Sequence, residues 1–118
     1  MATFKQRIGI GNPDRSYFEE VEALVDIRAT YTWLPKPLLE RLGHSPSLHR
    51  RLRLADGRII EREGVQIPIR IAGEVLLTIC LFGDEGSEPL LGAVTLEEFG
   101  LGVDTINQQL IPIVSLLI

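Results

Sequence analysis

Apolar and polar residues alternate with a period of two along most of the chain, and turn-forming residues recur at short intervals. Val21, Ala23 and Val25, for example, fall on one side of a strand and oppose two glutamates. This spacing is typical of a half-buried β-strand, because successive side chains of a strand point to opposite faces. The pattern predicts an all-β fold with one or two short helices. The expected strands cover residues 3–10, 17–26, 31–34, 51–54, 58–62, 65–71, 74–82 and 109–114.

Two glycine-containing turns predict β-hairpins. Ala55, Asp56 and Gly57 separate two strand-like runs, and an Asp-Gly pair at such a position is a strong short-range hairpin signal. Residues 72–73, an Ala-Gly pair, separate the next two runs in the same way.

Glycines also mark the ends of two expected helices. A Pro-Lys-Pro segment favours the start of a helix over residues 38–42, and Gly43 follows it as a left-handed C-terminal cap. Thr95 and Glu98 have the spacing of a capping box at the start of a second helix, which Gly100 is expected to end.

Length and composition indicate one domain over residues 1–118. A chain of 118 residues supports a single hydrophobic core, and 45% hydrophobic with 24% charged residues is a globular composition. The net charge of −4 argues against a dedicated nucleic-acid-binding protein, which normally carries a basic face. The basic segment 49–53 is therefore interpreted as a solvated strand face rather than a phosphate-binding site.

No metal site and no cofactor are expected. Cys80 is the only cysteine, so an intrachain disulfide and a cysteine-based metal site are excluded, and His44 and His49 are interpreted as surface residues. The apolar stretch 110–118 is too short to cross a bilayer, so no membrane span is predicted. We expect it to be buried, either within the subunit or in a dimer. No signal peptide is seen, and a cytoplasmic location is the default expectation.

Asp26 gives the most specific chemical signal. Its carboxylate follows an apolar strand and precedes a turn that contains Ala29 and Thr30. A charged group at such a position is costly unless it performs chemistry or caps a turn. Two aliphatic residues and a glycine precede the second expected helix: Leu90, Leu91 and Gly92. Together with the order of strands, helices and hairpins, these residues resemble the retropepsin-like aspartic protease family, especially its small bacterial and archaeal members, over about residues 4–114.

The resemblance implies a closed acid-protease-like β-barrel that hydrolyses peptide bonds. One motif supplies one carboxylate, so the family works as a homodimer in which Asp26 of each subunit meets its twin across a two-fold axis. Two carboxylates about 3 Å apart share one proton, because their repulsion is roughly 5 kcal/mol at an effective dielectric near 20. One then activates a water and the other stabilises the oxyanion. The hairpin at Ala55, Asp56 and Gly57 takes the place of the flap that closes over a peptide or protein substrate.

Two positions of the motif depart from the family pattern. Ile27 stands where the family has a threonine or serine, whose hydroxyl bonds across the dimer axis. Arg28 stands where the family has a glycine. A guanidinium about 5 Å from Asp26 favours ionisation by roughly 3 kcal/mol at the same dielectric, and so favours an ion pair over a shared proton.

Three interpretations are open at this stage. The chain is an active aspartic endopeptidase with Asp26 as the shared acid and base, or a homologue that Ile27 and Arg28 have impaired and that serves as a binding or interaction domain. In the third, the chain is an unrelated β-rich module in which Asp26 only caps a turn.

Overall fold

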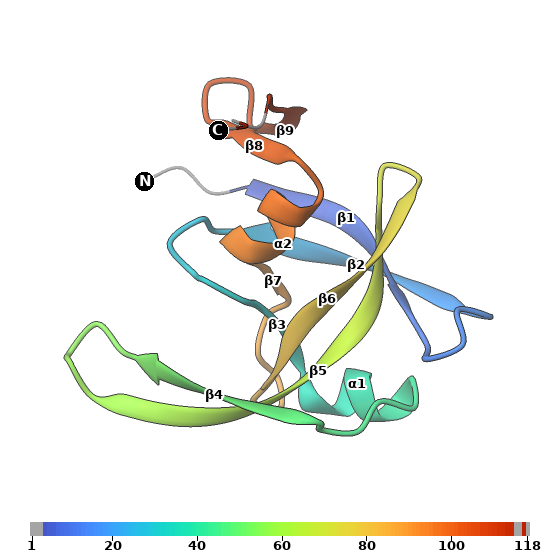
Figure 1. Cartoon of the computed structure of the whole chain (residues 1–118), viewed down its shortest axis with the longest axis vertical. Coiled ribbons are helices and arrows are strands. Elements are labelled where there is room, and N and C mark those ends of the chain that lie inside the picture. The colour runs from blue at the N-terminus through green and yellow to red at the C-terminus, as the bar shows by residue number, and fades with distance from the viewer. Residues whose placement is uncertain (1–3, 115–116, 118) are drawn as a thin grey trace.

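The computed structural model describes residues 4–114 and 117, and its architecture is mostly β (Figure 1). A seven-stranded sheet forms the body of the protein, with two short helices, α1 (Lys36–Arg41) and α2 (Ala93–Glu98). The strands of this sheet are β1 (Phe4–Gly11), β2 (Phe18–Val25), β3 (Thr32–Pro35), β4 (Leu48–Arg53), β5 (Ile59–Ile71), β6 (Glu74–Gly83) and β7 (Leu90–Leu91). A separate two-stranded sheet consists of β8 (Leu101–Asp104) and β9 (Gln109–Pro112).

The main sheet curves back on itself. Its strand order is β1-β2-β7-β3-β6-β5-β4, and β1 pairs in addition with β5 through Gly9 opposite Arg70 and Ile10 opposite Ile69. Six strands therefore form a ring, and β4 continues past it as an edge strand that pairs only with β5. The expected β-rich class with two short helices is confirmed.

The core fills the inside of this ring. Every second side chain of a strand points inward and belongs to the core. In β5 these side chains are Ile67, Ile69 and Ile71, which are at most 3% exposed. Burial of each such aliphatic side chain contributes about 1.5–3 kcal/mol relative to leaving it in water. Cys80 is completely buried in the same core, and burial raises the pKa of its thiol.

β7 connects two distant parts of the sequence. It lies between β2, with which it pairs in parallel, and β3, with which it pairs antiparallel. Leu90 is opposite Leu24 in one ladder and opposite Trp33 in the other. The turn between β2 and β3, which contains Asp26, is thereby fixed against the start of α2.

The expected boundary inside β5 is wrong. Two strands were expected over residues 58–62 and 65–71, but β5 is one strand of 13 residues. Gly64 does not interrupt it, because the missing side chain makes room for neighbours. A Cβ at Gly64 would lie 2.7 Å from a methyl carbon of Leu48 and 2.9 Å from one of Leu81. The expected stretch 109–114 ends as β9 at Pro112, and β8 was not expected at all.

The expected capping box at Thr95 and Glu98 is also wrong. The N-cap residue of α2 is Gly92, three residues before Thr95, and no side chain caps the helix. Thr95 is fully buried inside the helix and forms hydrogen bonds within the core. The caps at the other end are confirmed, since Gly43 and Gly100 follow their helices with left-handed φ angles of 92° and 67°.

The C-terminal segment departs from the expectation of burial within the subunit. Ile113, Val114 and Leu117 are 47%, 99% and 95% exposed, and residues 115, 116 and 118 of the expected stretch lie outside the described residues. The reason is that β8 and β9 pair only with each other and stand at one end of the molecule (Figure 1). Leu101, Val103 and Leu110 pack against the core and leave the rest of the segment outside.

No helix in the described ranges 4–114 and 117 combines the length and the apolar character needed to cross a membrane.

Candidate functional site

Asp26 occupies the first position after β2, in a turn that the backbone fixes firmly. Its N–H donates to the carbonyl of Leu91 at 3.1 Å, and its own carbonyl accepts from the N–H of Ala29 at 3.1 Å. The Asp26 side chain is only 14% exposed. β7 therefore determines where this carboxylate lies.

The rest of the turn is held by the first residues of α2. The N–H groups of Ala93 and Val94 donate to the carbonyls of Ala29 and Thr30 at 2.8 and 2.9 Å. Gly92 allows this close approach: a Cβ there would lie 2.4 Å from the carbonyl oxygen of Tyr31. The structure thus brings together the two segments that carried the resemblance, residues 26–30 and 90–92.

A buried chain of hydroxyl groups supports this junction from behind. Gly92 donates its N–H to Thr32 Oγ1 at 3.1 Å, and Thr32 Oγ1 lies 2.6 Å from Thr95 Oγ1. Thr95 Oγ1 lies 3.0 Å from Thr78 Oγ1, which donates to a carboxylate oxygen of Glu98 at 2.6 Å. The sequence analysis missed this network. The signal that could have revealed it is a threonine among apolar residues in each of three elements: Thr32 in β3, Thr78 in β6 and Thr95 in α2.

Arg28 closes over Asp26 with both ends of its guanidinium. Its Nε lies 3.1 Å from Asp26 Oδ1 and its Nη2 lies 3.2 Å from Oδ2, while its backbone N–H donates to Oδ1 at 3.0 Å. The ion pair expected from the sequence is confirmed. The Arg28 side chain itself is 63% exposed, so it covers the carboxylate from the solvent side.

The electrostatic result is a carboxylate whose charged form is favoured. The Arg28 side chain, as hydrogen-bond donor, is the main reason that the pKa of Asp26 lies below its ordinary value, and this effect outweighs the opposing effect of burial. The same pairing raises the pKa of Arg28. Ile27 adds no polar group to the site, and its side chain is 55% exposed.

The hairpin expected at Ala55, Asp56 and Gly57 is present, between β4 and β5. Gly57 has a φ of 90°, and its N–H donates to the carbonyl of Leu54 at 2.9 Å. Asp56 accepts from the Arg58 N–H at 3.0 Å and from its Nε at 2.7 Å, and these bonds lower the pKa of Asp56. The hairpin, called the flap hairpin below, extends from the body below the turn after β2 (Figure 1).

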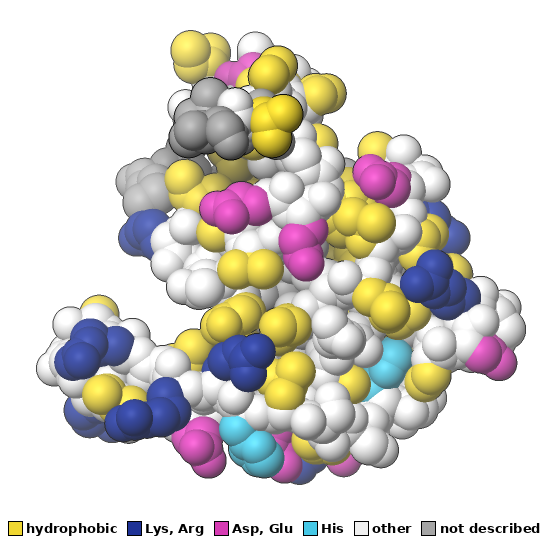
Figure 2. All heavy atoms as spheres, in the orientation of Figure 1, with side chains coloured by type: hydrophobic (Ala, Val, Ile, Leu, Met, Phe, Trp, Pro, Cys, Tyr) yellow, Lys and Arg dark blue, Asp and Glu magenta, His cyan; other side chains and the backbone are white. Residues whose placement is uncertain are grey.

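The flap hairpin contacts the turn after β2 through its stem, not its tip. Arg50 of β4 donates through Nε to the Tyr31 hydroxyl at 3.1 Å, and its guanidinium carbon lies 5.8 Å from the centre of that ring. Figure 2 shows the surface hollowed between the flap hairpin and the part of the molecule above it, with apolar side chains at the base of the hollow.

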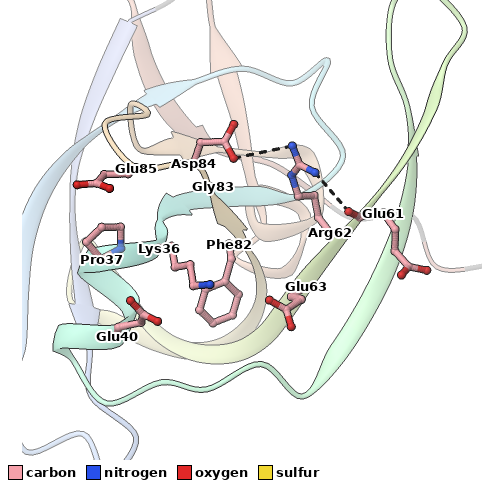
Figure 3. A pocket seen from close by; sticks show the side chains of 10 residues that line it. All are labelled: Lys36, Pro37, Glu40, Glu61, Arg62, Glu63, Phe82, Gly83, Asp84 and Glu85. Carbon is pink, nitrogen blue, oxygen red and sulfur yellow. Dashed lines mark hydrogen bonds and ion pairs between the residues drawn. The ribbon is translucent and has the colours of Figure 1, made fainter.

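A pocket of about 400 Å³ lies elsewhere, beside α1 and the end of β6 (Figure 3). Its lining contains no residue of the 26–30 turn. The Arg62 side chain lines this pocket, and its Nη2 lies 3.9 Å from Asp84 Oδ1. The lining residues are Lys36, Pro37, Glu40, Glu61, Arg62, Glu63, Phe82, Gly83, Asp84 and Glu85.

The two histidines differ in their burial. His44 is 6% exposed and its Nε2 lies 2.7 Å from the Gly11 carbonyl oxygen, so the expectation of a surface position is wrong for His44. His49 is exposed as expected. In the described part of the chain, no group of three or more His, Cys, Asp or Glu side chains is placed to hold a metal ion.

Comparison with known proteins gives no assignment. No protein-family model matches the sequence, and no curated protein matches it significantly.

Proposed function

We propose that this chain is a retropepsin-like aspartic peptidase homologue in which Arg28 holds Asp26 as a permanent ion pair, and that the domain binds an extended peptide without hydrolysing it. An acid-protease-like barrel is part of this proposal. The observation that carries it is the contact of both carboxylate oxygens of Asp26 with one guanidinium, at 3.1 and 3.2 Å.

This ion pair opposes each step of aspartic protease chemistry. A dyad needs one protonated carboxyl group, but the lowered pKa of Asp26 keeps the carboxylate charged. It also needs room for a water between the two carboxylates, while the Arg28 side chain lies against Asp26 instead. A charged carboxylate whose two oxygens both accept hydrogen bonds from an arginine is a weak base toward water.

The features that would hold a peptide are independent of this ion pair. The flap hairpin borders the hollow seen in Figure 2, and Arg50 connects the stem of the hairpin to Tyr31. β4 pairs on one side only, with β5, so its other edge offers main-chain groups to an extended strand. These features support binding without hydrolysis.

A second candidate is the active homodimeric endopeptidase, which the intact scaffold around Asp26 favours. The backbone bonds from Asp26 to Leu91 and from Ala93 to Ala29 hold the turn without any help from the Arg28 side chain. Because that side chain is 63% exposed, it has space to turn toward solvent when the carboxylate of a second subunit approaches.

Four proteins separate the two candidates: the natural sequence, Asp26→Asn, the double variant Ile27→Thr with Arg28→Gly, and that double variant combined with Asp26→Asn. Each is incubated with a peptide library at about pH 4 to 6, where an aspartic dyad works, and products are counted by mass spectrometry. We expect the natural sequence to cleave no faster than Asp26→Asn. The double variant should gain a cleavage that disappears when Asp26 is also replaced.

Two results would contradict the proposal. Cleavage by the natural sequence that Asp26→Asn abolishes would establish the active endopeptidase instead. A double variant that folds and dimerises but cleaves nothing would show that Arg28 is not what prevents hydrolysis.

A further inference from the structure

The two faces of the flap hairpin carry their charges differently. On the outer face Arg51 lies opposite Glu61, and such opposite charges stabilise a cross-strand pair. On the inner face, which faces Tyr31, Arg50 lies opposite Arg62. Like charges directly opposite each other destabilise a sheet. The inner face therefore keeps an arrangement that the fold alone does not favour.

Arg62 has a carboxylate partner, although its buried Nε makes no hydrogen bond, whereas Arg50 has no carboxylate partner among the described residues. Arg62 lies 3.9 Å from Asp84 in a pocket with several other acidic side chains (Figure 3). Arg50 makes no ion pair with any carboxylate of the described residues. Its half-buried guanidinium is held by neutral oxygens only, the Tyr31 hydroxyl at 3.1 Å and the His49 carbonyl at 2.9 Å.

The general role of charges on an edge strand does not account for Arg50. Exposed arginines on such a strand disfavour association with the same basic edge of another copy, and Arg51 and Arg53, both exposed, fit that role. Arg50 instead points inward and lies against the Tyr31 ring, with its centroid 5.8 Å from the guanidinium carbon. A planar cation that is fixed in place, partly desolvated and without a counter-ion in the described part of the chain matches the requirements for binding a carboxylate.

We propose that the peptide bound by this domain is acidic and that one of its side-chain carboxylates pairs with Arg50. The proposal rests on the function proposed above, binding of an extended peptide. The peptide lies along the free edge of β4, where main-chain bonds give affinity and alternate side chains give specificity. Charge complementarity supports this choice: residues 48–64 hold five arginines and three acidic residues, in a chain of net charge −4.

Fluorescence anisotropy with three fluorescein-labelled peptides of equal length tests the proposal. The peptides alternate valine with glutamate, with glutamine or with lysine, so that every second side chain carries the tested group. We expect the glutamate peptide to bind about tenfold more tightly than the glutamine peptide, because one hydrogen bond to a charged group increases affinity by at least about that factor. The lysine peptide should bind most weakly.

The variant Arg50→Gln should reduce the affinity for the glutamate peptide to that for the glutamine peptide. Arg51→Gln is the matched control, because it removes the same charge from the neighbouring position on the outer face, and it should change the affinity less than threefold. Arg50→Lys keeps the charge and should retain part of the preference for the glutamate peptide over the glutamine peptide. This variant shows whether the loss in Arg50→Gln comes from the missing charge or from a folding defect.

Several outcomes would overturn the inference, and they are distinguishable. Equal binding of the glutamate and glutamine peptides would remove the acidic preference and leave the peptide-binding function standing. Absence of binding by all three peptides would overturn both proposals. An equal loss in Arg50→Gln and Arg51→Gln would show a diffuse charge effect. Tighter, Arg50-dependent binding of a single-stranded oligothymidylate would assign the site to phosphate instead.

Discussion

At the scale of single residues, Arg28 changes the site by addition rather than by loss. The retropepsin-like pattern has a glycine at this position, whose backbone N–H is available to the aspartate. Arg28 still donates that N–H to Asp26, at 3.0 Å, and adds two guanidinium contacts. The turn therefore keeps its backbone contact. Its carboxylate, however, no longer shares a proton with a second carboxylate, because the guanidinium of Arg28 neutralises its charge.

The ion pair predicts a particular dependence of stability on pH. The folded-state pKa of Asp26 is lowered, so the pair stabilises the fold above the unfolded pKa of about 3.9, and this stabilisation is lost as the pH falls through the folded pKa. Arg28→Gln should therefore lower the urea midpoint at neutral pH, with a difference that shrinks toward acid. The pKa of Asp26, followed by carboxyl NMR, should rise toward its ordinary value.

Arg53→Gln serves as the control for this experiment, because Arg53 is an exposed arginine without a carboxylate partner among the described residues. Its urea midpoint should follow that of the natural sequence in parallel at every pH. A difference for Arg28→Gln that stays constant from neutral to acid pH would mean that the ion pair does not form in solution.

At the scale of elements, the crossing of β7 and α2 over the 26–30 turn determines the site. The sequence identified Gly92 as part of a pattern, and the structure gives the physical reason, which is the approach of the Tyr31 carbonyl. The φ of Gly92 is −99°, which any residue adopts, so the requirement for glycine is one of space and not of backbone conformation.

Gly92→Ala should therefore destabilise the protein strongly. The new Cβ would lie 2.4 Å from the Tyr31 carbonyl oxygen, and backbone must move to make room. We expect a loss of about 3 kcal/mol in the free energy of unfolding, at the upper end for overpacking, measured by urea denaturation. In the control Gly9→Ala, the nearest atoms belong to the flexible Arg70 side chain at 3.1 Å, so the loss should be smaller. An equal loss in both variants would refute the steric argument.

Sequence reasoning found local features of these elements and missed those that depend on distant contacts. The hairpin at Gly57 and the left-handed cap at Gly43 follow from turn chemistry within a few residues, and both were predicted. Thr95 was assigned to a capping box because its spacing to Glu98 fits one. The same spacing arises when the threonine points into the core to meet Thr32 and Thr78, which lie far away in sequence.

At the scale of the whole molecule, the alternation of apolar and polar residues predicted the β-rich class. It could not predict the order of the strands in the sheet. The insertion of β7 between β2 and β3 depends on ladders between segments that are distant in sequence. The exposure of the C-terminal segment could not be predicted either. An apolar segment indicates that its side chains are buried, but it does not indicate which surface covers them. In the structure, β8 and β9 form a sheet of their own, and apolar side chains remain on its outside.

These exposed side chains lead to a prediction about assembly. Ile113, Val114 and Leu117 are 47%, 99% and 95% exposed, and burial of a fully exposed aliphatic side chain against a second copy would contribute about 1.5–3 kcal/mol, with less from the half-buried Ile113. We expect a homodimer in sedimentation velocity, and the double variant Ile113→Asp with Val114→Asp should weaken it at least a hundredfold. Leu77→Asp is the matched control, since Leu77 is also 47% exposed but lies on β6, in the main sheet. A natural sequence that sediments as a monomer at every concentration would contradict the homodimer, and with it the second candidate function, because a single copy supplies only one Asp26.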